Sequence, residues 1–223
     1  EFSDPLHTKL YKGETRGGLT DFILKEQIDA TVEKHFRREL ELRKQGIKVL
    51  SIFFIDRVSN YREYEDGGQG KGKFALWFEE SFKKWQNYNA DYKTLFGGLS
   101  PEKVHNGYFA QDKKTGQFKD SKEGVRKPTA DDESAFELIM RDKERLLNID
   151  EPLRFIFSHS ALREGWDNPN VFQICTLVET RSEIKKRQEI GRGLRLAVNQ
   201  EGVRVKDRSV NQLVVIANES YED

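Results

Sequence analysis

Two hydrophobic patterns divide this chain into the strands and helices of an α/β protein. The first is a short, nearly continuous apolar run, which is typical of a strand buried on both faces. Such runs lie at 47–55, 104–109, 153–157, 171–178 and 212–217. Because longer segments with helical spacing separate several of these runs, the pattern predicts a parallel sheet covered by helices on both faces.

The second pattern repeats apolar residues every three or four positions and predicts helices. The first helix is expected to start after Thr20, a capping residue, and to end near Gly46. Its expected buried stripe consists of Phe22, Ile23, Ile28, Val32, Phe36 and Leu40. Residues 74–96 predict one or two helices that pack on the sheet through Leu76, Phe78, Phe82, Trp85 and Leu95.

A further helix is expected over 133–147, after two acidic residues that complement the positive end of a helix dipole. Residues 1–18 are polar and turn-rich, so they predict an N-terminal strap or linker. Residues 19–223 then form one domain with an exposed insertion at about 60–130, because 111–132 contain few apolar residues.

Composition limits the partners of this domain. Acidic and basic residues balance at 38 each, so any contact with DNA has to be a local patch. Cys175 lies within an apolar run and is expected to be a small buried hydrophobe. His105 has no partner at metal-ligand spacing, so no metal site is expected. No apolar run approaches about 20 residues and no signal-peptide pattern opens the chain, which predicts a cytoplasmic protein without a membrane partner.

Polar and cationic residues gather in a helical segment near the carboxyl end. Gln188, Gly191, Arg192 and Arg195 follow a Q-x-x-G-R-x-x-R pattern, whose spacing places them on one helix face. Arginine keeps its charge and binds phosphate oxygens through a planar fork of donors. The pattern therefore indicates a phosphate-binding face, although a solvated basic helix would have the same spacing.

The loop 165–169 (GWDNP) lies between two predicted strands, shortly before the arginine segment. A loop at a strand end is where open α/β sheets bind ligands. Gly165 permits a tight turn, and Asp167 can accept a hydrogen bond from a ribose hydroxyl. A plain turn would explain Gly165 equally well, so Gly165 and Asp167, together with Gly191 of the arginine pattern, are candidates for nucleotide binding.

A glycine-lysine segment contains part of a phosphate-binding loop motif. Gly67, Gly72 and Lys73 have the spacing of G-x-x-x-x-G-K, but Phe74 stands where the motif needs a hydroxyl. The preceding segment is polar and cannot be the required buried strand. We interpret this segment as a flexible loop, and a stand-alone nucleotide-binding enzyme that uses Lys73 stays an alternative.

Two of these motifs together resemble those of superfamily 2 helicases. The run SALREGWDNPNV (160–171) is similar to motif V, and QEIGRGLR (188–195) is similar to motif VI. The runs at 46–64, 137–147, 155–177 and 186–196 further resemble the motor (restriction, Res) subunit of type III restriction-modification enzymes. The resemblance extends from about Ile28 to about Val203.

The resemblance implies a second RecA-like motor domain. In that family Arg192 and Arg195 correspond to the motif VI arginines, one of which acts as an arginine finger toward ATP, and Gln188 lies beside the same phosphates. Ser158 and Ser160 fall near the contacts with the nucleic-acid backbone. ATP with Mg²⁺ would be held mainly by a preceding RecA-like domain of the same polypeptide that is absent from this chain.

The leading hypothesis is therefore half of an ATP-dependent DNA translocase, inactive alone, within a type III restriction endonuclease. Its implied partners are double-stranded DNA, the preceding domain and the modification (methyltransferase) subunit. The alternative is a non-catalytic nucleic-acid-binding or assembly module that has a helicase-like fold.

Overall fold

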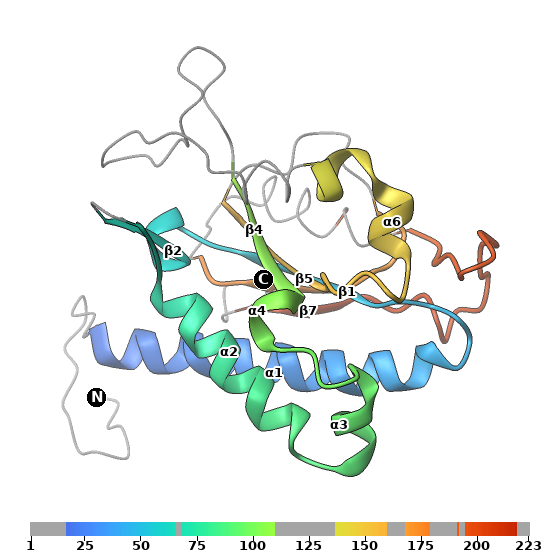
Figure 1. Cartoon of the computed structure of the whole chain (residues 1–223), viewed down its shortest axis with the longest axis horizontal. Coiled ribbons are helices and arrows are strands. Elements are labelled where there is room, and N and C mark those ends of the chain that lie inside the picture. Colours follow the sequence, from blue (N-terminus) through green and yellow to red (C-terminus); the bar gives the residue numbers. More distant parts are fainter. Residues whose placement is uncertain are drawn as a thin grey trace, which may run out of the picture.

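A five-stranded parallel sheet forms the centre of the protein, in the order β4-β5-β1-β6-β7 (Figure 1). The computed structural model describes residues 17–65, 68–109, 137–159, 168–178, 191 and 195–217. The strands are β1 (Leu50–Phe54), β4 (His105–Phe109), β5 (Phe155–His159), β6 (Val171–Thr176) and β7 (Val214–Ile216). The predicted parallel α/β architecture is confirmed.

The remaining elements are short apart from two helices. The helices are α1 (Gly17–Arg43), α2 (Lys73–Gln86), α3 (Ala90–Leu95), α4 (Pro101–Val104) and α6 (Lys143–Leu147). A 3₁₀ turn, η1, spans Val58–Asn60, and a π-helical turn, η2, spans Glu137–Arg141. Strands β2 (Arg62–Glu65) and β3 (Gly68–Lys71) form an antiparallel hairpin outside the main sheet.

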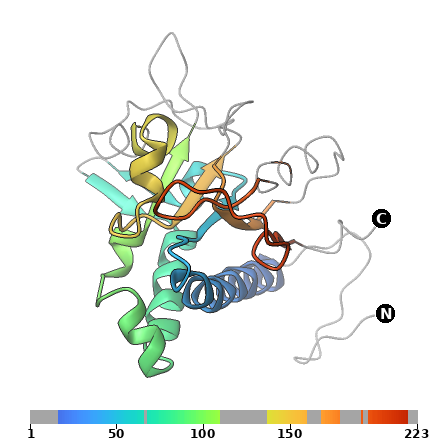
Figure 2. The same ribbon diagram turned by 90° about the vertical axis from the view of Figure 1, so that its right-hand side faces the viewer.

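Helices cover both faces of the sheet, as Figures 1 and 2 show. Side chains alternate along each strand, so β1 sends Phe53 toward α1 and α2, and Ile52 toward η2 and α6. In the first layer the Phe53 and Phe157 rings stack with their centroids 4.5 Å apart. In the second layer Ile139 and Leu146 pack against Ile52. This two-sided burial explains why the strands are apolar along their whole length.

The predicted stripe of α1 is correct in its middle and wrong at its start. Ile28, Val32 and Phe36 are completely buried, whereas Phe22 is 61% exposed and Ile23 is 44% exposed. Counting back from Ile28 in steps of three and four reaches Leu24, which packs against the core instead. In α2, Phe78 and Phe82 are buried, but Leu76 is 52% exposed because it lies on the opposite side of the helix.

The exposed insertion predicted at about 60–130 is narrower than expected. Helix α2 supplies Phe74 and Phe78 to the core, and β4 pairs with β5 in the main sheet. Only the β2–β3 hairpin stands apart among the described residues of that range; residues 110–136 lie outside them.

Two other predicted elements differ in the structure. The helix expected over 133–147 is interrupted: η2 ends at Arg141, and α6 restarts from Asp142, whose side chain accepts a hydrogen bond from the Arg145 amide. Strand β7 was expected to be buried, but Val214 is 36% exposed, since β7 is an edge strand.

Candidate functional site

The nucleotide- and DNA-binding residues predicted from the sequence are only partly described by the structure. Ser158, Gly191 and Arg195 are described, whereas Gly165, Asp167, Gln188, Arg192 and Ser160 lie outside the described residues. The roles expected for the residues outside the described ones stay predictions, and the described segments that flank them define the geometry of the candidate site.

Ser158 lies at the carboxyl end of β5, between Phe54 of β1 and Tyr108 of β4. Its side chain is completely buried, and its Oγ has no hydrogen-bond partner within the described part of the chain. A hydroxyl that contacts a DNA backbone has to be accessible, so this burial counts against Ser158 as a direct contact.

The loop 165–169 was expected to lie where parallel sheets bind ligands, at the carboxyl ends of the strands. Its described residues, Asn168 and Pro169, are instead joined through Asn170 to the start of β6. The Leu50 amide at the start of β1 donates a hydrogen bond to the Asn170 carbonyl oxygen (2.9 Å). This end of the loop therefore lies at the amino edge of the sheet, opposite to Ser158.

The end of the arginine segment reaches the same edge. Arg195 is exposed, and one of its Nη atoms lies 3.5 Å from the Gly191 carbonyl oxygen. After Arg195 the chain turns inward at Ala197, which is completely buried and packs with Leu42, Val49 and Phe172. The exposed Arg195 is thus followed, two residues later, by the buried and packed Ala197.

Asn170 joins the two segments through both atoms of its side-chain amide. Its Nδ2 donates to the Val198 carbonyl oxygen (2.9 Å), and its Oδ1 accepts from the Val198 amide (2.8 Å). Asn170 is completely buried. Two hydrogen bonds therefore join Asn170, at the end of the loop before β6, to Val198, shortly after the arginine segment. We call this contact the Asn170 clamp.

Further amide side chains fix the segment that follows Arg195. The Ala197 amide donates to the Asn211 Oδ1 (2.8 Å). The Gln200 side chain accepts from the Ile149 amide (3.0 Å) and donates to the Leu147 carbonyl oxygen (2.9 Å). The Gln200 backbone amide donates to Gly46, just before β1. Residues 197–200 are thus attached to the chain ahead of β1, β5 and β6.

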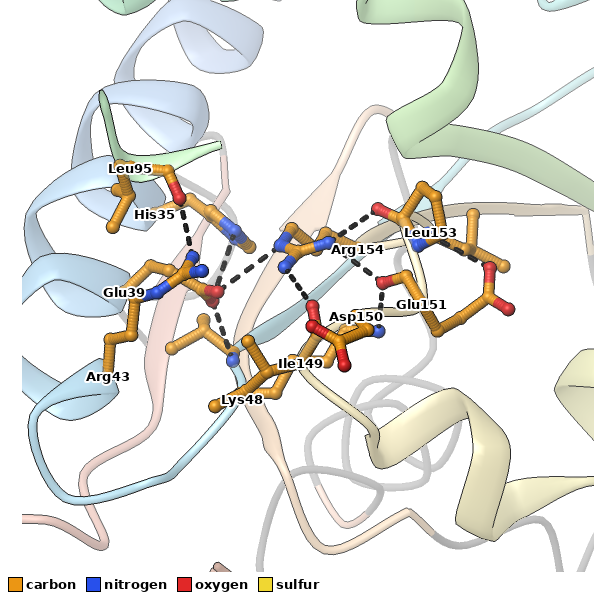
Figure 3. Close-up of polar contacts among 12 residues, drawn as sticks. His35, Glu39, Arg43, Lys48, Leu95, Ile149, Asp150, Glu151, Leu153 and Arg154 are labelled. Atoms are coloured by element: carbon orange, nitrogen blue, oxygen red, sulfur yellow. Dashed lines mark hydrogen bonds and ion pairs between the residues drawn. The ribbon is translucent and has the colours of Figure 1, made fainter. Parts of the chain in front are cut away.

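A buried charged network lies between α1 and the sheet, as Figure 3 shows. The Arg154 guanidinium donates to Glu39 Oε1 (Nε to Oε1 3.2 Å) and to the carbonyl oxygens of Ile149 and Glu151. The other Glu39 oxygen accepts from the Val49 amide (2.8 Å). Glu39 and Arg154 are 0% and 2% exposed, so each polar group is satisfied inside the protein.

Two further basic residues belong to this network. Burial, with the Arg154 charge second, lowers the pKa of Lys48 to about 7. Its Nζ donates to the carbonyl oxygens of Leu146 (2.8 Å) and Glu151 (2.7 Å). Burial and the neighbouring Arg154 also hold the pKa of His35 well below its ordinary value, so the ring, 3.8 Å from Glu39, is neutral rather than ion-paired. The sequence reasoning missed this network.

A second polar network connects the hairpin to the sheet. The Tyr61 hydroxyl lies 2.7 Å from His105 Nδ1, and His105 Nε2 lies 3.3 Å from Glu79 Oε1. Lys71 of β3 reaches the same carboxylate at 2.7 Å. Burial alone would raise the pKa of Glu79, but the hydrogen bonds from His105 and Lys71 outweigh it and lower that pKa. The histidine that seemed isolated in the sequence is therefore a packed core residue.

The glycine-lysine segment has a structural role in the described fold. Residues 68–71 pair with 62–65 in the antiparallel hairpin, whereas a phosphate-binding loop follows a buried strand. Lys73 begins α2 and pairs with Asp21 at 2.6 Å. A Cβ on Gly72 would lie 2.3 Å from the Ser59 carbonyl oxygen, so close backbone packing alone explains this glycine.

The described residues lack both a cluster of possible metal ligands and a helix able to span a membrane. They contain no group of three or more His, Cys, Asp or Glu residues that could hold a metal ion. The carboxylate of Asp56, which follows the apolar run 47–55, accepts a hydrogen bond from the Asn60 side chain (2.6 Å).

Among the described helices, none has the length and apolar character needed to cross a membrane.

Comparison with known proteins supplies the family context for these segments. No family model matches the chain. It is 43% identical over 188 residues to the type III restriction-modification enzyme EcoP15I Res subunit of Escherichia coli. It is 40% identical over 203 residues to the EcoPI Res subunit of Escherichia phage P1. It is 35% identical over 225 aligned positions to the StyLTI Res subunit of Salmonella typhimurium.

These alignments cover 80%, 86% and 88% of this chain but 18%, 19% and 21% of the relatives, so the chain spans about a fifth of their length. A solved structure, Mss116p DEAD-box helicase domain 2 bound to an RNA duplex, matches with 14% identity, covering 88% of this chain and 52% of that chain. Its TM-score of 0.38 is too low to support the fold or the function. Over most of its length, the chain is a homologue of one segment of the Res subunits of type III restriction-modification enzymes.

Proposed function

We propose that this chain is the second motor domain of an ATP-dependent DNA translocase, the Res subunit of a type III restriction endonuclease. It would act with a preceding RecA-like domain of the same polypeptide that binds ATP and Mg²⁺, with double-stranded DNA, and with the modification subunit. The chain alone would be inactive, because the phosphate-binding loop and the magnesium ligands belong to the other domain.

The observation that carries this proposal is the meeting of two segments at the Asn170 clamp. One segment ends the loop that contains Gly165 and Asp167, and the other follows the run that contains Gln188, Arg192 and Arg195. The similarity to Res subunits extends over 80–88% of the chain and supplies the family. An exposed Arg195 beside a packed anchor suits a group that reaches across to another domain.

In the proposed mechanism, domain closure brings Arg192 and Arg195 to the γ-phosphate of ATP. Charge on the transferring phosphoryl group is spread over its oxygens, and a guanidinium presents several donors to them at a fixed charge. Gln188 would lie beside the same phosphates, while Gly165, Asp167 and Gly191 would lie near the nucleotide. Separation of the domains after hydrolysis would couple ATP turnover to movement on DNA.

DNA-stimulated ATPase activity of the polypeptide that contains both domains tests this proposal. Arg192→Ala and Arg195→Ala should each lower kcat by about 10³-fold or more, the usual effect of losing an arginine finger or its partner. Arg208→Ala removes another exposed arginine and serves as the matched control. Circular dichroism and urea titration would verify that the variants stay folded.

The outcome that would contradict the proposal is near-normal turnover in both variants. If DNA binding by the same variants then weakened in a salt-dependent manner, the chain would instead be a non-catalytic nucleic-acid-binding module, because phosphate contacts release counterions on binding.

A further inference from the structure

We infer that Asn170 is a positioning residue for the arginine segment: it fixes the place from which Arg195 is presented relative to the loop before β6. The inference rests on the proposed function and gives a role to Asn170, which lies in the run 160–171 but is not among the candidate site residues. Asn170 acts through its hydrogen bonds to the backbone of Val198 and not by contact with a reacting group.

The backbone of Asn170 is fixed in place by hydrogen bonds of its own. Its carbonyl oxygen accepts from the Leu50 amide of β1 (2.9 Å), and its amide donates to the Asn168 Oδ1 (3.2 Å). Asn168 is also completely buried. The backbone of Asn170 is therefore held by the central strand of the sheet. Both hydrogen bonds of its side chain are made to Val198.

The chemistry of the contact requires an amide. The backbone amide of Val198 donates to the Asn170 Oδ1 (2.8 Å), and the Val198 carbonyl oxygen accepts from the Asn170 Nδ2 (2.9 Å). Only an amide side chain offers both an acceptor and a donor in this way. An aspartate would place a carboxylate oxygen against the Val198 carbonyl oxygen. An alanine would remove both bonds and leave the two Val198 backbone groups without these partners.

The position of Val198 connects this contact to the chemistry. Val198 follows Arg195 closely in the chain, and between them Ala197 is buried and held by Asn211. Without the Asn170 clamp, Ala197 keeps its bond to Asn211, but the chain just after Ala197 loses its attachment to the loop before β6, so the position of Arg195 relative to that loop can shift. A misplacement of about 1 Å in a catalytic group reduces turnover by about 10²-fold, so a loosened segment should affect kcat more than ATP affinity.

The experiment compares Asn170→Ala with Asn89→Ala in the polypeptide that contains both motor domains. Asn89 caps α3 by accepting a hydrogen bond from the Tyr92 amide (2.8 Å), so its replacement also removes an asparagine side-chain to backbone bond, but one within α3 that does not involve residues 191–200. Two quantities are measured: steady-state ATPase kinetics with DNA, and amide hydrogen exchange of the peptide covering 191–200. Arg195→Ala is assayed in parallel.

In Asn170→Ala, we expect kcat to fall by about 10- to 100-fold with KM for ATP within about twofold, together with faster exchange over 191–200. Asn89→Ala should leave kcat, KM and that exchange unchanged. If Arg195→Ala abolishes turnover while Asn170→Ala behaves like Asn89→Ala, the positioning role is wrong and the proposed function stands. If Arg195→Ala leaves turnover unchanged, the positioning role is wrong, and the proposed function is also wrong only if Arg192→Ala leaves turnover unchanged as well.

Discussion

Glu39 and Arg154 form an ion pair inside the protein although 115 positions separate them in the sequence. The pair joins the carboxyl-terminal part of α1 to the residue before β5, and both side chains are almost completely inaccessible to solvent. Each also bonds to backbone groups at the amino ends of the strands. The contact therefore determines how α1 lies on this end of the sheet.

Glu39→Ala should be strongly destabilising. It leaves the Arg154 guanidinium buried without its carboxylate, and breaking a buried pair in this way costs about 3–5 kcal/mol. Glu33→Ala is the matched control, because Glu33 pairs with Arg37 on the exposed side of the same helix, where such pairs contribute about 0–1 kcal/mol. Urea denaturation measures both; similar losses of unfolding free energy in the two variants would refute the structural role.

The buried Lys48 should make stability depend on pH in the alkaline range. Its pKa is about 7 in the folded protein, against 10.5 as the ordinary value. Between these values the unfolded chain binds a proton that the folded chain does not, so the free energy of unfolding rises with pH over that window. The Lys48 contribution is lost as pH falls through about 7.

Lys48→Met removes this titration and isolates its effect. The difference in unfolding free energy between the original protein and the variant should grow, in favour of the original, by about 1 kcal/mol or more from about pH 7 to about pH 10. Lys44→Met, at an exposed position after α1, should show a constant difference. Urea titrations at several pH values would measure this, and a constant difference for Lys48→Met would contradict the assignment.

Gly72→Ala should destabilise the hairpin and the start of α2. The added Cβ would meet backbone atoms of Ser59 and Asn60 at 2.3–2.6 Å, and backbone cannot move aside as a flexible side chain can. Gly70→Ala, on the same hairpin, meets the Glu63 Cβ at 3.3 Å and should be much milder. Thermal unfolding should show a loss of about 1–3 kcal/mol for Gly72→Ala; equal melting temperatures for the two variants would argue against the packing role.

Lys73→Ala tests whether the glycine-lysine segment 67–73 has only a structural role or binds a nucleotide. Its pair with Asp21 is partly exposed, so stability should change by about 1 kcal/mol or less, and titration of the chain with Mg·ATP should be unaffected by the substitution. An ATP affinity that falls at least about tenfold, about 1.4 kcal/mol, in Lys73→Ala would restore the alternative of a stand-alone P-loop enzyme.

The sheet could be predicted from the sequence because burial on both faces leaves an unambiguous signature. All five residues of β1 are buried, and the run LSIFF contains no charged residue. The α1 face is harder to predict, since Thr31, His35 and Glu39 are on its buried side. Helical spacing does place them there, but their polarity suggests solvent until their distant partners are known.

The candidate site shows the same limit. The spacing of Gln188, Arg192 and Arg195 indicates one helix face from the sequence alone. The contact between Asn170 and Val198 spans 28 positions, and an asparagine after a proline looks like an ordinary turn residue. Asn168 and Pro169 lie at the amino edge because a loop between parallel strands must cross from one edge of the sheet to the other, and the sequence does not say where each residue lies along that crossing.

The attachment of residues 197–200 to the starts of three strands has a mechanical consequence. A force applied at Arg195 is shared among Gly46, Ile149 and Asn170, each of which leads directly or closely into a different strand of one hydrogen-bonded sheet. Stretching any one attachment therefore strains the others. The described part of the chain should therefore respond to such a force by rotating as a rigid block.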